Sequence, residues 1–205
     1  MKKKNSTLAL VLAMALILGG AFVVYGKLSR NVPSDKLLVA SAQAEEKSAD
    51  AASETEASEA DAAQQPALSL APDFRVYDKD GNEVMLSSFF GKPIVLNFWA
   101  SWCPPCRMEM PDFNEKYLEL GDQVHFLMVN MTAGRETKAE AEKFIREQNF
   151  SFPVYFDLKQ DAAMTYGAYS LPVTYFIGRN GEAIAQATGA IDAVTLQRGI
   201  DMIMP

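Results

Sequence analysis

The only two cysteines of the chain limit most strongly what it can fold into. Among 205 residues, Cys103 and Cys106 lie three residues apart. The apolar run at residues 94–100 comes just before them, and it has the length and composition of a buried central strand. A helix is expected to begin at about Cys103. The pair is therefore predicted at a strand-to-helix junction, an arrangement typical of a reversible dithiol and disulfide centre.

Physical arguments assign different roles to the two sulfurs. At the start of a helix, unpaired amide N–H groups and the positive end of the helix dipole would stabilise a Cys103 thiolate. Cys106, one turn later, can close a disulfide with Cys103 and is predicted to be the less exposed sulfur. Pro104 and Pro105 fit the first helical turn, where proline is best tolerated, and they make it rigid.

Residue counts exclude several other kinds of site. Cys103, Cys106 and the single histidine, His125, are one ligand short of a structural zinc site, and we expect no metal and no cofactor beyond the cysteine pair. His125 alternates within a predicted strand, which favours a structural role over a Cys–His hydrolase. Residues 68–205 carry a net charge of −6 with no basic stripe, which argues against a nucleic-acid partner.

The N-terminal region, residues 1–40, is predicted to anchor the protein in a membrane. Residues 7–26 carry no charge, and as a helix they would span roughly 30 Å, the thickness of a bilayer core. Three lysines at positions 2–4 predict a cytoplasmic N-terminus and an extracytoplasmic domain, hence a single-pass cell-membrane protein. Cleavage of a signal peptide after residues 42–44 (Ala-Gln-Ala) is the alternative. The length of the uncharged run favours the anchor, and either outcome exports the domain.

Composition separates a linker from a folded domain. Residues 41–67 consist almost entirely of Ala, Ser, Glu, Asp, Thr and Gln with a net charge of −6, so they are predicted to be a disordered tether, with a partly helical stalk as the alternative. Residues 68–205 alternate strand and helix signals, which predicts an α/β domain. The expected strands are 74–77 and 83–86 (a hairpin), 94–100, 124–130, 153–156, 173–177 and 182–188. Helices are expected from about residue 103, over residues 136–148 and over residues 193–204. The first is expected to be interrupted by a kink at Pro111, where proline lacks the N–H and its ring clashes with the preceding turn.

Several motifs together resemble the thioredoxin-like proteins, and in particular their membrane-anchored TlpA/ResA branch. The segment 97–107, Asn-Phe-Trp-Ala-Ser-Trp-Cys-Pro-Pro-Cys-Arg, is similar to the family's active-site segment. Pro111 matches the proline of the active-site helix, and Leu171-Pro172 matches the family's cis-proline. The opening at 71–74 and the stretch 86–92 resemble the TlpA/ResA branch. The resemblance implies a thioredoxin fold, a central mixed β-sheet flanked by α-helices, with an N-terminal hairpin extension.

The resemblance also implies an activity. Cys103 would attack a disulfide and Cys106 would resolve the mixed disulfide. The implied direction is reduction of disulfides in exported proteins, for example haem-binding cysteines of apocytochromes c, with electrons from a CcdA-type membrane protein. An oxidant of exported proteins is one alternative. A non-catalytic binding or chaperone module with a structural disulfide is another.

Further site residues follow from the family pattern. Glu109, three positions after Cys106, would tune the protonation of the dithiol, although an acid there is also favourable with the helix dipole. The implied substrate groove is shaped by Trp102, Pro104, Pro105, Leu171 and Pro172, whereas Trp99 is expected in the core. Two positions depart from the pattern: Asn97 replaces the buried aspartate of thioredoxin, and Leu171 stands where many relatives carry threonine.

Overall fold

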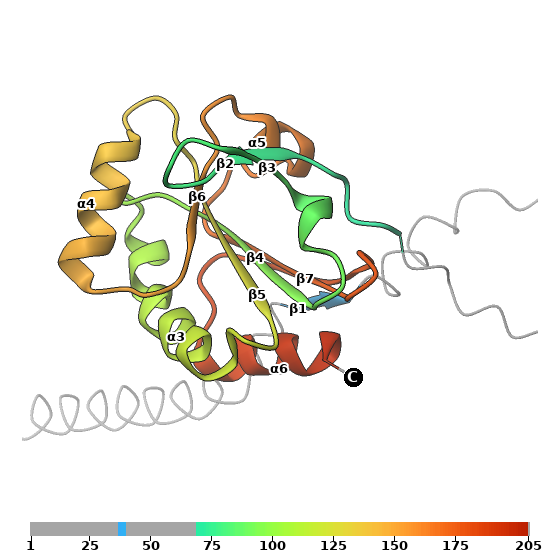
Figure 1. Cartoon of the computed structure of the whole chain (residues 1–205). Helices are drawn as coiled ribbons and strands as arrows, with labels where there is room; N and C mark the ends of the chain where they lie inside the picture. The colour runs from blue at the N-terminus through green and yellow to red at the C-terminus, as the bar shows by residue number, and fades with distance from the viewer. Residues whose placement is uncertain (1–36, 40–68, 205) are drawn as a thin grey trace, which may run out of the picture. The chain divides into compact units, whose positions relative to one another are not determined.

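The computed structural model describes residues 37–39 and 69–204, which form one mixed sheet with helices packed against it (Figure 1). The strand order is β1-β8-β7-β4-β5-β6-β2-β3. The strands are β1 (Leu37–Val39), β2 (Arg75–Tyr77), β3 (Glu83–Met85), β4 (Ile94–Trp99), β5 (His125–Asn130), β6 (Val154–Phe156), β7 (Val173–Ile177) and β8 (Ala183–Thr188). The helices are α3 (Pro104–Leu120), α4 (Lys138–Gln148), α5 (Asp161–Tyr166) and α6 (Ala193–Ile203), with the 3-10 helix η1 (Leu86–Phe89).

The strand that leads into the cysteines lies near the centre of the sheet. β4 pairs in parallel with β5 and antiparallel with β7, and all of its residues are buried. β5 also pairs in parallel with β6. The remaining pairs, β1 with β8, β2 with β3, β2 with β6 and β7 with β8, are antiparallel. Trp99 is in register with Asn130, so the loops that follow β4 and β5 begin side by side at one edge of the sheet.

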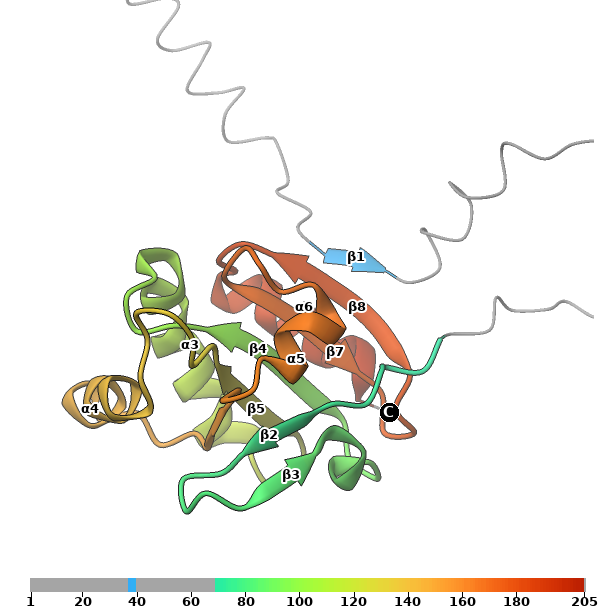
Figure 2. The same cartoon turned by 90° about the horizontal axis from the view of Figure 1, so that it is seen from above.

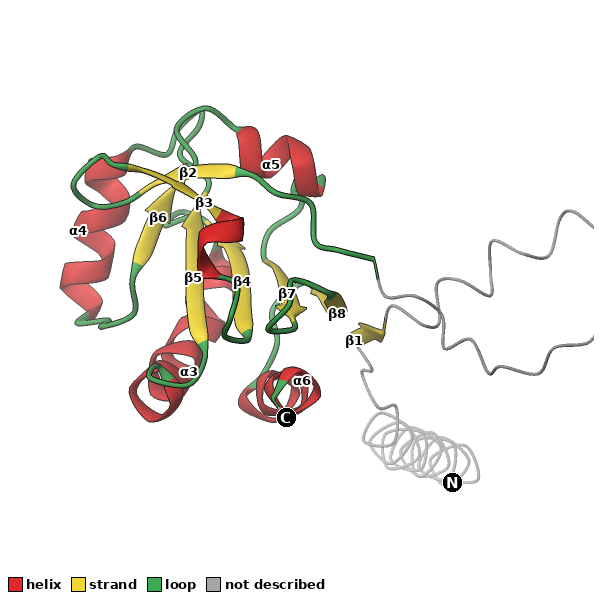
Figure 3. Ribbon diagram, turned by 45° about the vertical axis from the view of Figure 1, so that its right-hand side comes forward, coloured by secondary structure: helices red, strands yellow, loops and turns green. Residues whose placement is uncertain are grey.

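Alternation along β4 divides the core into two layers. Val95 and Trp99 pack in the layer built with α3, α4 and α6, whereas Leu96 and Phe98 pack in the layer built with α5, η1 and β2. Figure 3 shows α3 and α6 at one side of the strands and α5 at the other. Because successive side chains of a strand point to opposite faces, a continuous apolar strand is what a sheet covered on both faces requires.

The predicted thioredoxin-like α/β fold is confirmed, including the hairpin of β2 and β3. The predicted elements are present with ends shifted by one or two residues. The active-site helix α3 continues through Pro111 to Leu120, so this proline does not end the helix, and the kink expected there stays a prediction. Two short helices, η1 and α5, were not predicted as such.

Strand β1 was also not predicted, and it comes from the segment expected to follow the membrane anchor. It pairs antiparallel with β8, with Leu37 opposite Ala187 and Val39 opposite Ala185. Leu37 is buried in the same core layer as Trp99. Figure 2 shows β1 beside β8 at one edge of the sheet and β3 at the opposite edge.

The predicted anchor at residues 7–26, the cleavage motif at 42–44 and the linker at 41–67 lie outside the described residues. Within the described ranges, 37–39 and 69–204, none of the helices has the length and apolar character needed to cross a membrane.

Candidate active site

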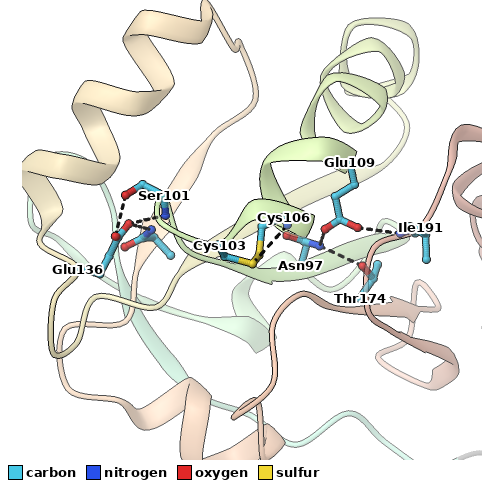
Figure 4. Close-up of a disulfide and its surroundings, with 9 residues drawn as sticks. Asn97, Ser101, Cys103, Cys106, Glu109, Glu136, Thr174 and Ile191 are labelled. Carbon is cyan, nitrogen blue, oxygen red and sulfur yellow. Dashed lines mark hydrogen bonds between the residues drawn. A yellow bond between two sulfur atoms is a disulfide. The ribbon is translucent and has the colours of Figure 1, made fainter.

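The two cysteines form a disulfide at the start of α3 (Figure 4), with an S–S distance of 2.12 Å and Cα atoms 5.3 Å apart. Cys103 is the N-cap residue, and its Sγ accepts a hydrogen bond from the backbone N–H of Cys106 at 3.3 Å. Pro104 and Pro105 occupy the first two helical positions. The predicted place of the pair at a helix N-terminus is therefore what the structure shows, and a thiolate on Cys103 would meet an amide N–H already aimed at it.

An open groove of about 520 Å³ borders the disulfide. Cys103 lines this groove, whereas Cys106 does not and is fully buried. In the disulfide, Cys103 is 3% exposed and Cys106 is 0% exposed. The two cysteines therefore differ little in exposed area, and the main difference is that Cys103 borders the groove. Every residue that lines the groove is uncharged: Trp102, Cys103, Pro104, Pro105, Met131, Ala133, Gln160, Ala163, Met164, Ala168, Tyr169, Ser170 and Leu171.

The groove brings together four of the five residues predicted to shape a substrate site: Trp102, Pro104, Pro105 and Leu171. The fifth, Pro172, is buried, and its peptide bond with Leu171 is cis, as the family pattern implied. Trp102 is 41% exposed and Tyr169 is 81% exposed. The groove therefore presents large side chains to solvent next to Cys103, a surface suited to an apolar polypeptide segment.

Glu109 points into the core, where only 2% of its surface is exposed. Its Oε1 accepts a hydrogen bond from Nδ2 of Asn97 at 2.8 Å, and its Oε2 accepts one from the backbone N–H of Ile191 at 3.0 Å. Nδ2 of Asn97 also donates to Oγ1 of Thr174, its register partner on β7, at 3.0 Å. The carboxyl group of Glu109 on α3 thus contacts Asn97 on β4, the position at which the family pattern places the buried aspartate of thioredoxin.

A second buried glutamate near the disulfide was missed by the sequence analysis. Glu136, in the loop between β5 and α4, is 3% exposed. Its Oε1 accepts from the backbone N–H of Ser101 and from Nδ2 of Asn130, and its Oε2 accepts from Oγ of Ser101, each at 2.8 Å. The neighbouring Arg135 places its guanidinium carbon 3.9 Å from the centre of the Trp102 ring. No motif in the sequence connects residue 136 with residue 101.

The remaining predictions concern residues away from the cysteines. Trp99 is fully buried, as predicted. His125 is half-buried and packs edge-on against Phe89, with ring centres 5.4 Å apart. Burial and the charge of Lys92 lower the pKa of His125. Over the described residues, no group of His, Cys, Asp and Glu side chains is arranged to hold a metal ion.

Comparison with known proteins agrees with the fold and the cysteine pair. A family model described as the AhpC/TSA family matches residues 68–185. The chain is 38% identical over 138 residues to the thiol-disulfide oxidoreductase ResA of Geobacillus kaustophilus, an alignment that covers 67% of this chain and 78% of that protein. The predicted resemblance to the ResA branch is confirmed.

Two solved structures share the fold. StoA from Bacillus subtilis is 26% identical with a TM-score of 0.56, covering 64% of this chain and 98% of that one. The exposed lipoprotein thioredoxin Etrx1 from Streptococcus pneumoniae is 28% identical with a TM-score of 0.56, covering 63% and 98%. Fold, cysteine pair and relatives together define a thioredoxin-like thiol–disulfide oxidoreductase. The chain belongs to the AhpC/TSA family, and the relatives it matches include the ResA proteins of several bacilli.

Proposed function

We propose that this oxidoreductase reduces disulfides in exported proteins, with Cys103 as the attacking thiol and Cys106 as the resolving thiol. The observation that carries the proposal is the difference between the two cysteines. Cys103 lines the open groove and caps α3, whereas Cys106 is fully buried behind it. A substrate disulfide in the groove can therefore meet only the first sulfur.

The reaction is a pair of thiol–disulfide exchanges. The Cys103 thiolate attacks one substrate sulfur, forming a mixed disulfide and releasing the other substrate sulfur as a thiolate. The Cys106 thiolate then attacks Sγ of Cys103, which restores the Cys103–Cys106 disulfide and releases the second substrate thiol. The substrate gains two electrons, and the enzyme loses two. A further cycle needs a dithiol donor, for which a CcdA-type membrane protein is the proposed source.

The setting proposed for this reaction comes from the sequence. Residues 7–26 would anchor the protein in the cell membrane with the N-terminus in the cytoplasm. The domain would then face exported proteins, with apocytochromes c as candidate substrates. The uncharged groove supports an apolar polypeptide segment as the partner rather than a nucleic acid. We propose no cofactor beyond the cysteine pair.

The reduction potential of the pair decides the direction. A reductase of exported proteins is expected to have a potential below about −200 mV, whereas an oxidant lies nearer to −120 mV. Equilibration of the full-length protein with glutathione or dithiothreitol buffers, read by alkylation of free thiols, measures it. A value above about −150 mV would support the oxidant instead.

Reduction of insulin tests the remaining alternative, a module with a structural disulfide. We expect turnover by the parent, none by Cys103→Ser, and a trapped mixed disulfide with Cys106→Ser, because that variant can attack but cannot resolve. Alkylation of the reduced protein at limiting reagent should label Cys103 first. Preferential labelling of Cys106 contradicts the assignment of roles.

A further inference from the structure

We propose that Glu136 is a positioning residue for the attacking cysteine, acting through Ser101 on the turn that carries Cys103. This inference rests on the proposed role of Cys103. Glu136 lies 33 positions after that cysteine and on a different loop. Its side chain accepts hydrogen bonds from Ser101 and Asn130, so its effect on Cys103 would pass through the backbone of residues 100–103.

Glu136 uses both of its carboxylate oxygens on this turn and its surroundings. The backbone N–H and the hydroxyl of Ser101 both donate to it, and the buried side chain of Asn130 donates as well. Hydrogen bonds to a carboxylate are stronger than neutral ones, and Glu136 is almost completely shielded from water. The carboxylate is therefore the main polar attachment of Ser101.

The loop that holds Glu136 is itself fixed at both ends. The backbone N–H of Met131 donates to the carbonyl of Trp99 at 2.8 Å, which extends the pairing of β4 with β5. At the other end, α4 begins with a capping box formed by Thr137 and Glu140. Because Glu136 directly precedes this capped helix, its position does not depend on the cysteine loop, and it can serve as a fixed support for that loop.

The supported turn leads directly to the reactive sulfur. The backbone N–H of Cys103 donates to the carbonyl of Ala100 at 3.2 Å, so Ser101 lies inside the turn that sets the direction of Cys103. Cys103 then accepts the N–H of Cys106 as the N-cap of α3. Stabilisation of a thiolate by a helix N-terminus falls off within the first turn, so the position of the sulfur decides how much of it is gained.

The test compares three variants of the full-length protein. Glu136→Ala removes all three contacts and is expected to slow insulin reduction about tenfold or more. It is also expected to raise the pKa of the Cys103 thiol above its value in Glu136→Gln, which lacks the same negative charge; alkylation rates across pH measure both. Glu136→Gln can keep the three contacts, because the hydroxyl of Ser101 can accept as well as donate, and it is expected within about threefold of the parent. Glu147→Ala, which removes an exposed glutamate of α4 paired with Lys143 and leaves the capping box and the Ser101 contacts in place, is the matched control.

The outcomes separate positioning from general loosening. A slow Glu136→Ala enzyme with a raised thiol pKa, rescued by Gln and not reproduced by Glu147→Ala, supports the proposal. It is overturned if Glu136→Ala matches the parent, if Gln is as impaired as Ala, or if Glu147→Ala has the same defect. Should Glu136→Ala not fold, Ser101→Ala removes one contact only and must show the same shift to a smaller degree. The thiol pKa requires no turnover, so failure of the parent to reduce insulin would count against the proposed function alone.

Discussion

The two buried glutamates beside the disulfide do different work. Glu109 lies on the same helix as the cysteines and ties that helix to β4 and to the loop before α6. Glu136 lies on another loop and ties that loop to the turn before Cys103. Figure 4 shows them on opposite sides of the cysteine pair. Glu109 holds the helix that carries both cysteines, and Glu136 holds the turn that positions Cys103.

The comparison shows which kind of site residue a sequence can reveal. Glu109 is three positions from Cys106 on a helix, so local spacing alone places it one turn away. Glu136 reaches Ser101 only because β4 and β5 pair in parallel with Trp99 opposite Asn130. A contact that depends on strand register between distant segments leaves no local pattern in a single sequence.

The largest effect on stability is expected from Glu109→Ala. The change leaves the backbone N–H of Ile191 without this carboxylate, removes one acceptor of Asn97 and opens a cavity, which should cost about 2–4 kcal/mol of unfolding free energy. Chemical denaturation measures it. Glu119→Ala, which removes an exposed partner of Lys116, is the control and should change stability by less than about 1 kcal/mol. Equal losses would show that Glu109 is an ordinary helix carboxylate.

The protonation role proposed for Glu109 is tested by Glu109→Gln, which keeps the shape and removes the titration. A negative charge near the sulfurs opposes thiolate formation, so we expect a lower apparent thiol pKa and a simpler pH profile in the variant. Thiolate absorbance and alkylation rates across pH report both. Superimposed profiles would end the analogy with the family at this position.

Arg135→Ala should have a smaller effect, because it removes support from a side chain rather than from the backbone. The guanidinium over Trp102 contributes about 0.5–1 kcal/mol at an exposed site. Since Trp102 lines the groove, we expect a KM for a protein substrate raised about two- to threefold with kcat unchanged. Arg146→Ala on the exposed surface of α4 is the control. A fall in kcat equal to that of Glu136→Ala would contradict the view that Arg135 supports only the Trp102 side chain, whereas Glu136 supports the backbone at Ser101.

The smallest effect is expected at the opposite end of β5, from His125→Gln. The pKa of His125 is lowered in the folded protein, so the unfolded chain binds the proton first as the pH falls below about 6.5, and folded stability decreases. The variant should lack this decrease and match the parent at pH 8. Denaturation midpoints at pH 8 and pH 5 measure the difference. A loss of reductase activity in the variant would contradict the structural role of this histidine.

The parts of the fold that could be predicted are those that local physics determines. The continuous apolar run of β4 and the cysteine spacing gave the centre of the sheet and the redox pair. Helix α5 was missed because it has only six residues, and its start depends on Asp157, whose carboxylate accepts the backbone N–H groups of Ala162 and Ala163. The groove was predicted only through the family resemblance, since Trp102 and Leu171 meet there by tertiary packing.

Strand β1 affects the length of chain that would link the predicted membrane anchor to the domain. Val39 lies opposite Ala185, and Leu70 forms a bridge with Glu182. Residues 39 and 70 therefore pair with two positions that are only three residues apart in the sequence. The length of the acidic stretch between residues 39 and 70 therefore does not set the distance between residue 36 and the sheet. If residues 7–26 hold the protein in a bilayer, only residues 27–36 separate bilayer from sheet, about 35 Å when fully extended. Partners would have to come to the membrane surface to be reduced, and lengthening the acidic stretch would not extend that reach.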